Sequence, residues 1–158
     1  MRGLVAVLAL ALSACSPQPP AETGSVPELD GAFGFGSLEV INDQGEAHHF
    51  DVYLATTPEQ QRRGLMFVRQ MPEDTGMLFI YEGGDYRSMW MKNTYIPLDM
   101  VFARADGSVS SIITNTVPQT LKSQVSVEPV TYVLELNGGT TRRLGIGTRS
   151  RLVLDVDE

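Results

Sequence analysis

Along most of the chain, apolar and polar residues alternate with the period of two that is typical of half-buried β-strands. The alternation first appears in "SLEVIN" (37–42) and "HHFDVYLA" (48–55), which the turn-forming segment "DQGE" separates. Further segments of strand length follow at 76–81, 86–93, 97–105, 108–114, 130–136 and 151–156. The pattern therefore predicts about eight short strands at regular spacing, as in a barrel or a sandwich.

The stretch "TPEQQRRGLMF", after the second predicted strand, carries the signals of one short helix. Thr57 is a candidate N-cap, and Gln60 completes a capping box with it. Pro58 suits the first helical position, and Gly64 suits the C-terminal end. Because the helices that parallel strands need as crossovers are missing, we expect a mainly β (α+β) fold. This fold would be a compact antiparallel or mixed β-barrel or sandwich with one short helix.

The first fourteen residues, "MRGLVAVLALALSA", have the pattern of a secretory signal peptide: one positive charge, a short apolar run and small residues at the end. The apolar run is too short for a transmembrane helix, which needs roughly 20 apolar residues. The closing "LSAC" resembles the lipobox of bacterial lipoproteins, in which cleavage precedes the Cys and the Cys carries the lipid. We therefore expect lipidation of Cys15; the alternative is an ordinary cleaved signal in which Cys15 is incidental.

A lipid on Cys15 would anchor the protein to a membrane without a spanning segment. Cys15 is the only Cys, so an intrachain disulfide is excluded. Ser16 rather than Asp follows it, which in a Gram-negative cell favours the periplasmic face of the outer membrane as the location in the cell envelope. Pro, Gly and small residues then predict a tether. The expected organisation is a signal peptide (1–14), the lipidated Cys with its tether (15–36) and one folded domain (37–158).

The net charge of the chain limits the classes of partner that we expect it to bind. There are 12 basic and 19 acidic residues, which gives a net charge of -7. An acidic chain without a basic stripe is a poor partner for nucleic acid. Electrostatics would not draw it to anionic lipid either, so the acyl chain itself would have to hold it at the membrane.

Six blocks occur in order along the predicted domain: "RGLMF" (63–67), "GMLF" (76–79), "WMKNTYIPLDMVF" (90–102), "DG" (106–107), Pro118 and "YVLEL" (132–136). Together they resemble a bacterial and archaeal family called domain of unknown function 192 (DUF192), whose members are often secreted or lipid-anchored. The resemblance implies a compact, mostly β fold and no known activity. One departure is Gly147-Thr148, where the family usually has Gly-Asp before its last strand, so any role of that Asp is in doubt here.

Six of the seven Met residues lie between Met66 and Met100, around the only Trp. A strand through "SMWMK" would place Met89 and Met91 on one face and Trp90 on the other. Core packing is the simpler interpretation, because Met fills irregular gaps and packs well against aromatic rings.

The alternative for these Met residues is a Cu(I) site, since thioethers select Cu(I). Met89, Met91 and one imidazole would be the ligands, with Trp90 as a cap. His48 and His49 are neighbours on a predicted strand, so only one of them can point inward.

A second group of polar residues follows the Trp. Asp99 sits in an apolar strand, and a buried carboxylate is costly unless it is paired. We expect Lys92 to be its partner across a hairpin. Trp90, Lys92, Asn93 and Asp99, joined by Glu135 from "VLEL", would form a pocket for a small polar ligand or a sugar. The alternative is that Lys92 and Asp99 only stabilise the hairpin.

Signs of catalysis are weak. The sequence lacks the Gly-x-Ser-x-Gly motif, a phosphate loop and paired zinc-binding His residues. Paired carboxylates such as Asp99 and Glu135 could in principle carry out glycoside hydrolysis, but nothing in the sequence fixes their separation. The favoured hypothesis is a non-catalytic, cofactor-free domain that binds a small ligand or glycan. The alternatives are a Cu(I)-binding envelope protein and an interaction or assembly subunit that docks an envelope protein through an exposed apolar patch.

Overall fold

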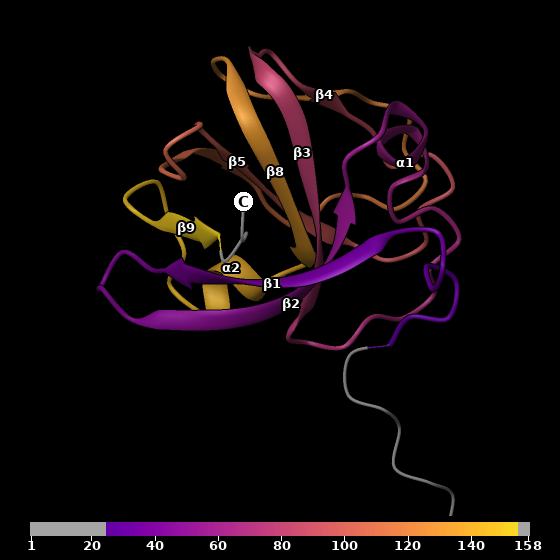
Figure 1. Cartoon of the computed structure of the whole chain (residues 1–158), viewed down its shortest axis with the longest axis horizontal. Coiled ribbons are helices and arrows are strands. Elements are labelled where there is room, and N and C mark those ends of the chain that lie inside the picture. Colours follow the sequence, from indigo (N-terminus) through magenta and orange to yellow (C-terminus); the bar gives the residue numbers. More distant parts are fainter. Residues whose placement is uncertain (1–24, 155–158) are drawn as a thin grey trace, which may run out of the picture.

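The computed structural model describes residues 25–154, and its ribbon is shown in Figure 1. This part of the chain forms nine strands and two short helices, which confirms the mainly β fold. Their bounds are β1 (Gly34–Ile41), β2 (Ala47–Ala55), α1 (Pro58–Arg63), β3 (Thr75–Asp85), β4 (Ser88–Met89), β5 (Leu98–Ala103), β6 (Val109–Ile113), β7 (Gln124–Val125), β8 (Val130–Asn137), α2 (Thr140–Arg143) and β9 (Arg151–Leu154). No helix within residues 25–154 is long and apolar enough to cross a membrane.

Seven strands form one strongly curled sheet in the order β6-β5-β8-β3-β2-β1-β9. Every pair in it is antiparallel except β2 and β3, which are parallel and are linked through α1. The two edges of the sheet approach each other, because Ser108 and Arg151 form a bridge and the Leu152 N–H donates to the Gly107 carbonyl at 2.8 Å. The sheet is therefore a half-closed barrel (Figure 1).

Both faces of the sheet are buried, and each face has its own hydrophobic cluster. The interior of the curl is packed with aliphatic side chains and Phe50. The outer face is rich in Met and aromatic residues, including Met77, Phe79 and Met100, and is covered by the N-terminal segment and the loops around α1 and β4. Five of the six Met residues after Met1 belong to this outer cluster, which confirms the core-packing interpretation for them.

The folded domain begins earlier than the sequence indicated. Residues 15–36 were expected to be a tether, yet Val26 and Leu29 are at most 1% exposed and belong to the outer cluster. The backbone N–H of Val26 also donates to the Tyr53 hydroxyl at 2.7 Å. Two apolar side chains spaced by three residues were a signal of burial within the Pro-rich composition. Cys15 and the predicted signal peptide lie outside the described residues.

Helix α1 has the predicted caps. The Thr57 hydroxyl accepts from the Gln60 N–H at 3.2 Å, and the Gln60 side chain accepts from the Thr57 N–H at 3.1 Å. Gly64 ends the helix with φ of 47°, and a Cβ there would lie 3.1 Å from the Phe79 ring. A glycine at this position therefore both stops the helix and lets its end approach β3.

The segment 86–93 was expected to be a full strand, but only Ser88–Met89 has strand structure. Its partner is β7, in the loop that the sequence left unassigned, and not β5. A second short helix, α2, lies between the last two predicted strands, in a Gly-rich segment. At the Gly147-Thr148 departure, the neighbouring Arg149 N–H and Ser150 hydroxyl donate to the Asp43 carboxylate at 3.1 and 2.8 Å.

Candidate functional site

Asp99 is fully buried in β5, but Lys92 is not its partner. The Asp99 carboxylate accepts from the backbone N–H groups of Asn115 at 2.7 Å, Gly139 at 2.9 Å and Thr141 at 2.9 Å. A fourth hydrogen bond comes from the Thr141 hydroxyl at 2.6 Å. The expected hairpin pairing is wrong, because β5 pairs with β6 and β8 and the segment of Lys92 pairs elsewhere.

Glu135 is the second buried carboxyl group, in the centre of β8. It is 3% exposed, and its neighbours in register are Met77 of β3 and Met100 of β5. Within the described residues its carboxyl makes no hydrogen bond and no ion pair. Burial among these apolar side chains raises the pKa of Glu135 to about 8. The group therefore carries its proton at neutral pH.

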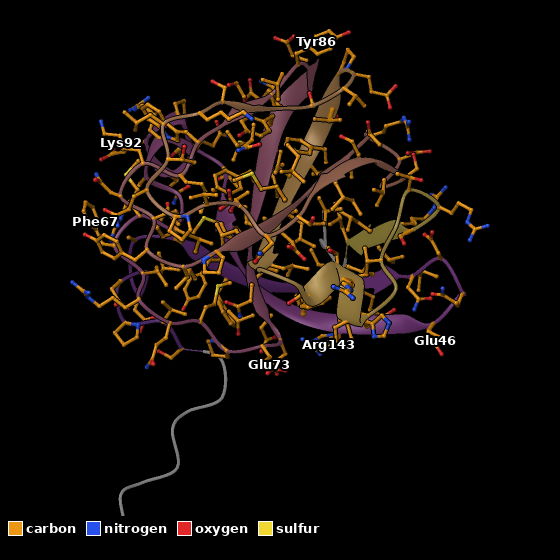
Figure 2. The ribbon with its side chains drawn as sticks, turned by 180° about the vertical axis from the view of Figure 1, so that it is seen from behind. Glu46, Phe67, Glu73, Tyr86, Lys92 and Arg143 are labelled. Carbon is orange, nitrogen blue, oxygen red and sulfur yellow. The ribbon has the colours of Figure 1, made fainter. Side chains whose placement is uncertain are left out.

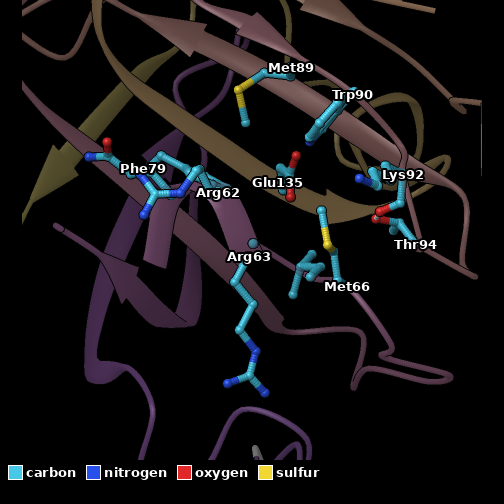
Figure 3. Close-up of a pocket in the computed structure, with 12 residues that line it drawn as sticks. Arg62, Arg63, Met66, Phe79, Met89, Trp90, Lys92, Thr94 and Glu135 are labelled. Atoms are coloured by element: carbon cyan, nitrogen blue, oxygen red, sulfur yellow. Dashed lines mark hydrogen bonds between the residues drawn. The ribbon is translucent and has the colours of Figure 1, made fainter. Parts of the chain in front are cut away.

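Glu135 lies at the base of a narrow pocket between α1 and the segment that follows β4 (Figure 3). The pocket leaves about 20 Å³ for the centre of a water-sized molecule, which is enough for one water or one hydroxyl group. Its mouth opens into a wider groove of about 420 Å³, with which it shares Gln61, Arg62, Met89 and Trp90. The pocket itself is lined by Gln61, Arg62, Arg63, Gly64, Leu65, Met66, Phe79, Met89, Trp90, Lys92, Thr94 and Glu135.

Three of the five predicted ligand-binding residues meet at this pocket: Trp90, Lys92 and Glu135. Trp90 is 46% exposed, and the Lys92 amine lies 5.1 Å from the centre of its ring. Figure 3 shows the Lys92 amine directed toward Glu135 and Arg62 on the opposite side of the opening. Asp99 does not line the pocket.

Asn93, the remaining predicted residue, does not line the pocket. Its backbone instead positions the loop that forms one wall. Its backbone is in the left-handed region, as is that of Phe67. The Phe67 N–H donates to the Asn93 carbonyl at 2.8 Å, and this bond joins the loop after α1 to the loop after β4. Met66 and Lys92, which flank this joint, are thereby positioned on the pocket rim.

The predicted copper ligands are not brought together. His48 and His49 line a surface depression with Glu73 and Arg143, whereas Met89 lines the pocket above Glu135. Figure 2 shows Arg143 and Lys92 on different sides of the molecule. Met91 is fully buried, and its sulfur accepts from the Thr116 hydroxyl at 3.2 Å. Within residues 25–154, no group of three or more His, Cys, Asp or Glu residues is placed to hold a metal ion.

The two buried carboxyl groups also cannot act as a catalytic pair. Met100 is the register partner of Glu135, and Asp99 precedes Met100, so the two acidic side chains point to opposite faces of the sheet. One wall of the barrel therefore separates them, whereas a glycosidase needs both groups at one sugar.

Tyr81 of β3 is a further titratable group close to Glu135. Burial, and secondarily the proximity of Glu135, raises the pKa of Tyr81 to about 12, while Arg87 lowers it. The Tyr81 hydroxyl donates to the Met89 sulfur at 3.5 Å, and the Arg87 guanidinium lies 4.1 Å from the centre of the Tyr81 ring. The hydrogen bond from Tyr81 fixes Met89 at the edge of the pocket.

Several pocket residues were missed at the level of sequence. Arg62, Met66 and Phe79 line the pocket but were not among the predicted site residues. They occur in or beside the blocks "RGLMF" and "GMLF", whose clustering was the available signal. Val117, Leu121 and Val127 are each more than 60% exposed, which bears on the interaction-subunit alternative.

Residues 39–154 match the DUF192 family, which is described as an uncharacterized ACR. A crystal structure of a candidate transcription regulator from Sinorhizobium meliloti 1021 is 45% identical, with a TM-score of 0.75, over 76% of this chain and 93% of its own. The crystal structure of a protein of unknown function from Novosphingobium aromaticivorans DSM 12444 is 34% identical, with a TM-score of 0.77, over 85% and 94%. No curated protein matches the chain.

Proposed function

The chain belongs to the DUF192 family, and we propose that its domain binds a small polar ligand, such as a sugar, in the pocket above Glu135. The role is recognition without chemistry, because the carboxyl group that a second catalytic acid would require is on the other face of the sheet. The acidic net charge of -7 gives no support for nucleic acid as the ligand.

The observation that carries the proposal is the unpartnered state of Glu135. A buried polar group without a hydrogen bond costs roughly 1–3 kcal/mol of folding free energy, so most proteins satisfy or remove it. Here the group is retained at the base of a pocket that opens to solvent. A ligand group that reaches this carboxyl can supply the hydrogen bond that no described residue makes.

The rest of the site fits a small ligand. The groove of about 420 Å³ lies in the usual size range of ligand sites, and Trp90 offers a flat, half-exposed ring beside it. Aromatic rings of this kind pack against the apolar face of a sugar while polar groups bind its hydroxyls. Ser88, Gln61 and Ser123 supply such polar groups along the groove.

The test uses the intrinsic fluorescence of the domain, since Trp90 is its only Trp. Titration with a panel of neutral sugars, amino sugars and sugar acids should give saturable quenching by at least one of them. We expect Glu135→Leu to weaken that binding at least tenfold, because the hydrogen bond at the base is lost. Glu39→Leu, at an exposed Glu of β1, is the matched control and should bind normally. Quenching that is equal in both variants would remove Glu135 from the site.

We also propose that Cys15 carries a lipid that keeps this binding domain in the cell envelope. The support is the "LSAC" sequence and the apolar segment before it. In a Gram-negative host given radiolabelled palmitate, the full chain should incorporate label and fractionate with the outer membrane. Cys15→Ser should lose the label; incorporation by this variant would contradict the proposal.

A further inference from the structure

The pocket and groove differ in charge from the rest of the molecule. The chain has seven more acidic than basic residues, yet Glu135 is the only acidic residue that lines either cavity among the described residues. Three basic residues, Arg62, Arg63 and Lys92, line the same pocket. Since burial keeps Glu135 protonated at neutral pH, the opening has a positive potential.

Two of these cationic side chains, those of Arg62 and Lys92, are available to bind a ligand. Arg63 is already engaged, because it donates to the Glu28 carbonyl at 2.5 Å and stacks on Phe33. Arg62 is exposed, and its side chain makes no ion pair or hydrogen bond within the described residues. The Lys92 amine makes no ion pair there either, and it lies over the Trp90 ring next to the opening.

The small size of the pocket places a second requirement on the ligand. Its base admits a group of about the size of one water, next to a protonated carboxyl that can both donate and accept a hydrogen bond. A hydroxyl group matches this space and this chemistry. The negatively charged end of the same ligand would lie at the mouth of the pocket, which both Arg62 and Lys92 line, where charge-assisted hydrogen bonds are available.

Building on the proposed function, we propose that the ligand is a small hydroxylated oxyanion. Its carboxylate or phosphate binds between Arg62 and Lys92, its hydroxyl reaches Glu135, and its apolar face packs on Trp90. Hydroxy acids, sugar acids and phosphate esters of polyols belong to this class.

Matched pairs of compounds test the charge requirement by calorimetric titration at neutral pH. Galacturonate, lactate and glycerol phosphate are compared with galactose, propanediol and glycerol. We expect at least one anion to bind ten times or more tightly than its neutral counterpart. Binding by the phosphate ester alone or by the carboxylates alone would identify the source of the oxyanion.

The cations are tested with Arg62→Gln combined with Lys92→Gln. This variant should bind the preferred anion at least tenfold more weakly and bind the neutral counterpart as the wild type does. Arg142→Gln combined with Arg149→Gln removes the same charge outside the pocket and groove and should change nothing. A neutral compound that binds as tightly as its anion would overturn the oxyanion inference and leave the proposed function standing. Absence of binding by every compound in both panels would overturn both.

Discussion

Asp99 and Glu135 lie on adjacent strands at the centre of the sheet, and both are at most 3% exposed. Asp99 faces the interior side, where three backbone N–H groups and one hydroxyl donate to it. Glu135 faces the outer side, between two Met residues, with no partner in the described residues. Two carboxyl groups on adjacent strands therefore differ completely in their hydrogen bonding: one has four donors and the other has none among the described residues.

The difference separates a structural group from a functional one. The hydrogen bonds of Asp99 join β5 to the loop after β6 and to the start of α2, so the carboxylate closes one end of the barrel. The carboxyl group of Glu135 makes no hydrogen bond to another described element, and its ionised form lowers the stability of the folded state. Retention of such a group next to an opening is the expectation for a binding site.

The largest effect is expected from Asp99→Ala. The substitution removes the acceptor of the part-buried N–H groups of Asn115 and Gly139 and of the buried N–H group of Thr141. At roughly 1–3 kcal/mol for each lost partner, we expect the free energy of unfolding to fall by about 5 kcal/mol. Urea unfolding followed by far-UV circular dichroism measures the loss, and ligand binding above Glu135 should persist in the protein that remains folded.

Thr141→Val is the graded control for this prediction. It removes only the hydroxyl that donates to Asp99 at 2.6 Å and keeps the three backbone donors, so we expect a loss of about 1–2 kcal/mol. If Asp99→Ala cost no more than Thr141→Val, the carboxylate would not be the element that holds this end of the barrel.

The next effect is a pH-dependent gain in stability from Glu135→Gln. The pKa of Glu135 is about 8 in the folded protein and near its ordinary value of 4.5 in the unfolded chain. Between these values the folded state binds more protons, so the stability of the wild type falls as the pH rises from about 4.5 to about 8. At 1.4 kcal/mol for each pKa unit the upper limit is about 5 kcal/mol. Because the pocket lets water approach the charge, we expect Glu135→Gln to be about 3 kcal/mol more stable than the wild type at pH 9.

The same comparison at pH 4 is the control, because Glu135 is protonated there in the folded state and mostly protonated in the unfolded state, and the variant should match the wild type within about 1 kcal/mol. Tyr81 from β3, Arg62 and Arg63 from α1 and Lys92 from the segment after β4 also face this group, and they are unchanged in the variant. Urea unfolding at pH 4, 6, 8 and 9 isolates the contribution of Glu135. A difference that does not vary with pH would show that Glu135 is hydrated or paired in the folded protein.

Much of the fold was predictable because its signals are local. The alternation in β1 and β2, the capping box of α1 and the Asp106-Gly107 turn each depend on neighbouring residues. The same is true of Met89, Trp90 and Met91: their alternating burial follows from the backbone period even though the strand is only two residues long. The start of the domain was missed because composition dominated the interpretation of residues 25–36, although Val26 and Leu29 had helical spacing.

The site was predictable only in part. Trp90, Lys92 and Glu135 were identified from their neighbours in the sequence, but Asp99 was assigned to the same pocket because its strand partner was unknown. The hydrogen bonds of Asp99 reach 16, 40 and 42 residues along the chain, and no local pattern specifies such partners. Arg62 was not identified as a site residue, because the sequence does not show which strand its helix faces.

The sequence by itself determined most of the strands of the large sheet, where the one early helix begins and ends, and which side chains of a strand share a face. These properties depend on backbone geometry and on residues within a few positions. Only the tertiary structure decided which strands are neighbours and which loops cover them. This arrangement provides Asp99 with four hydrogen-bond donors and leaves Glu135 at the base of an opening. The partners of a buried group come from distant parts of the chain, which only the packing of the whole domain brings together.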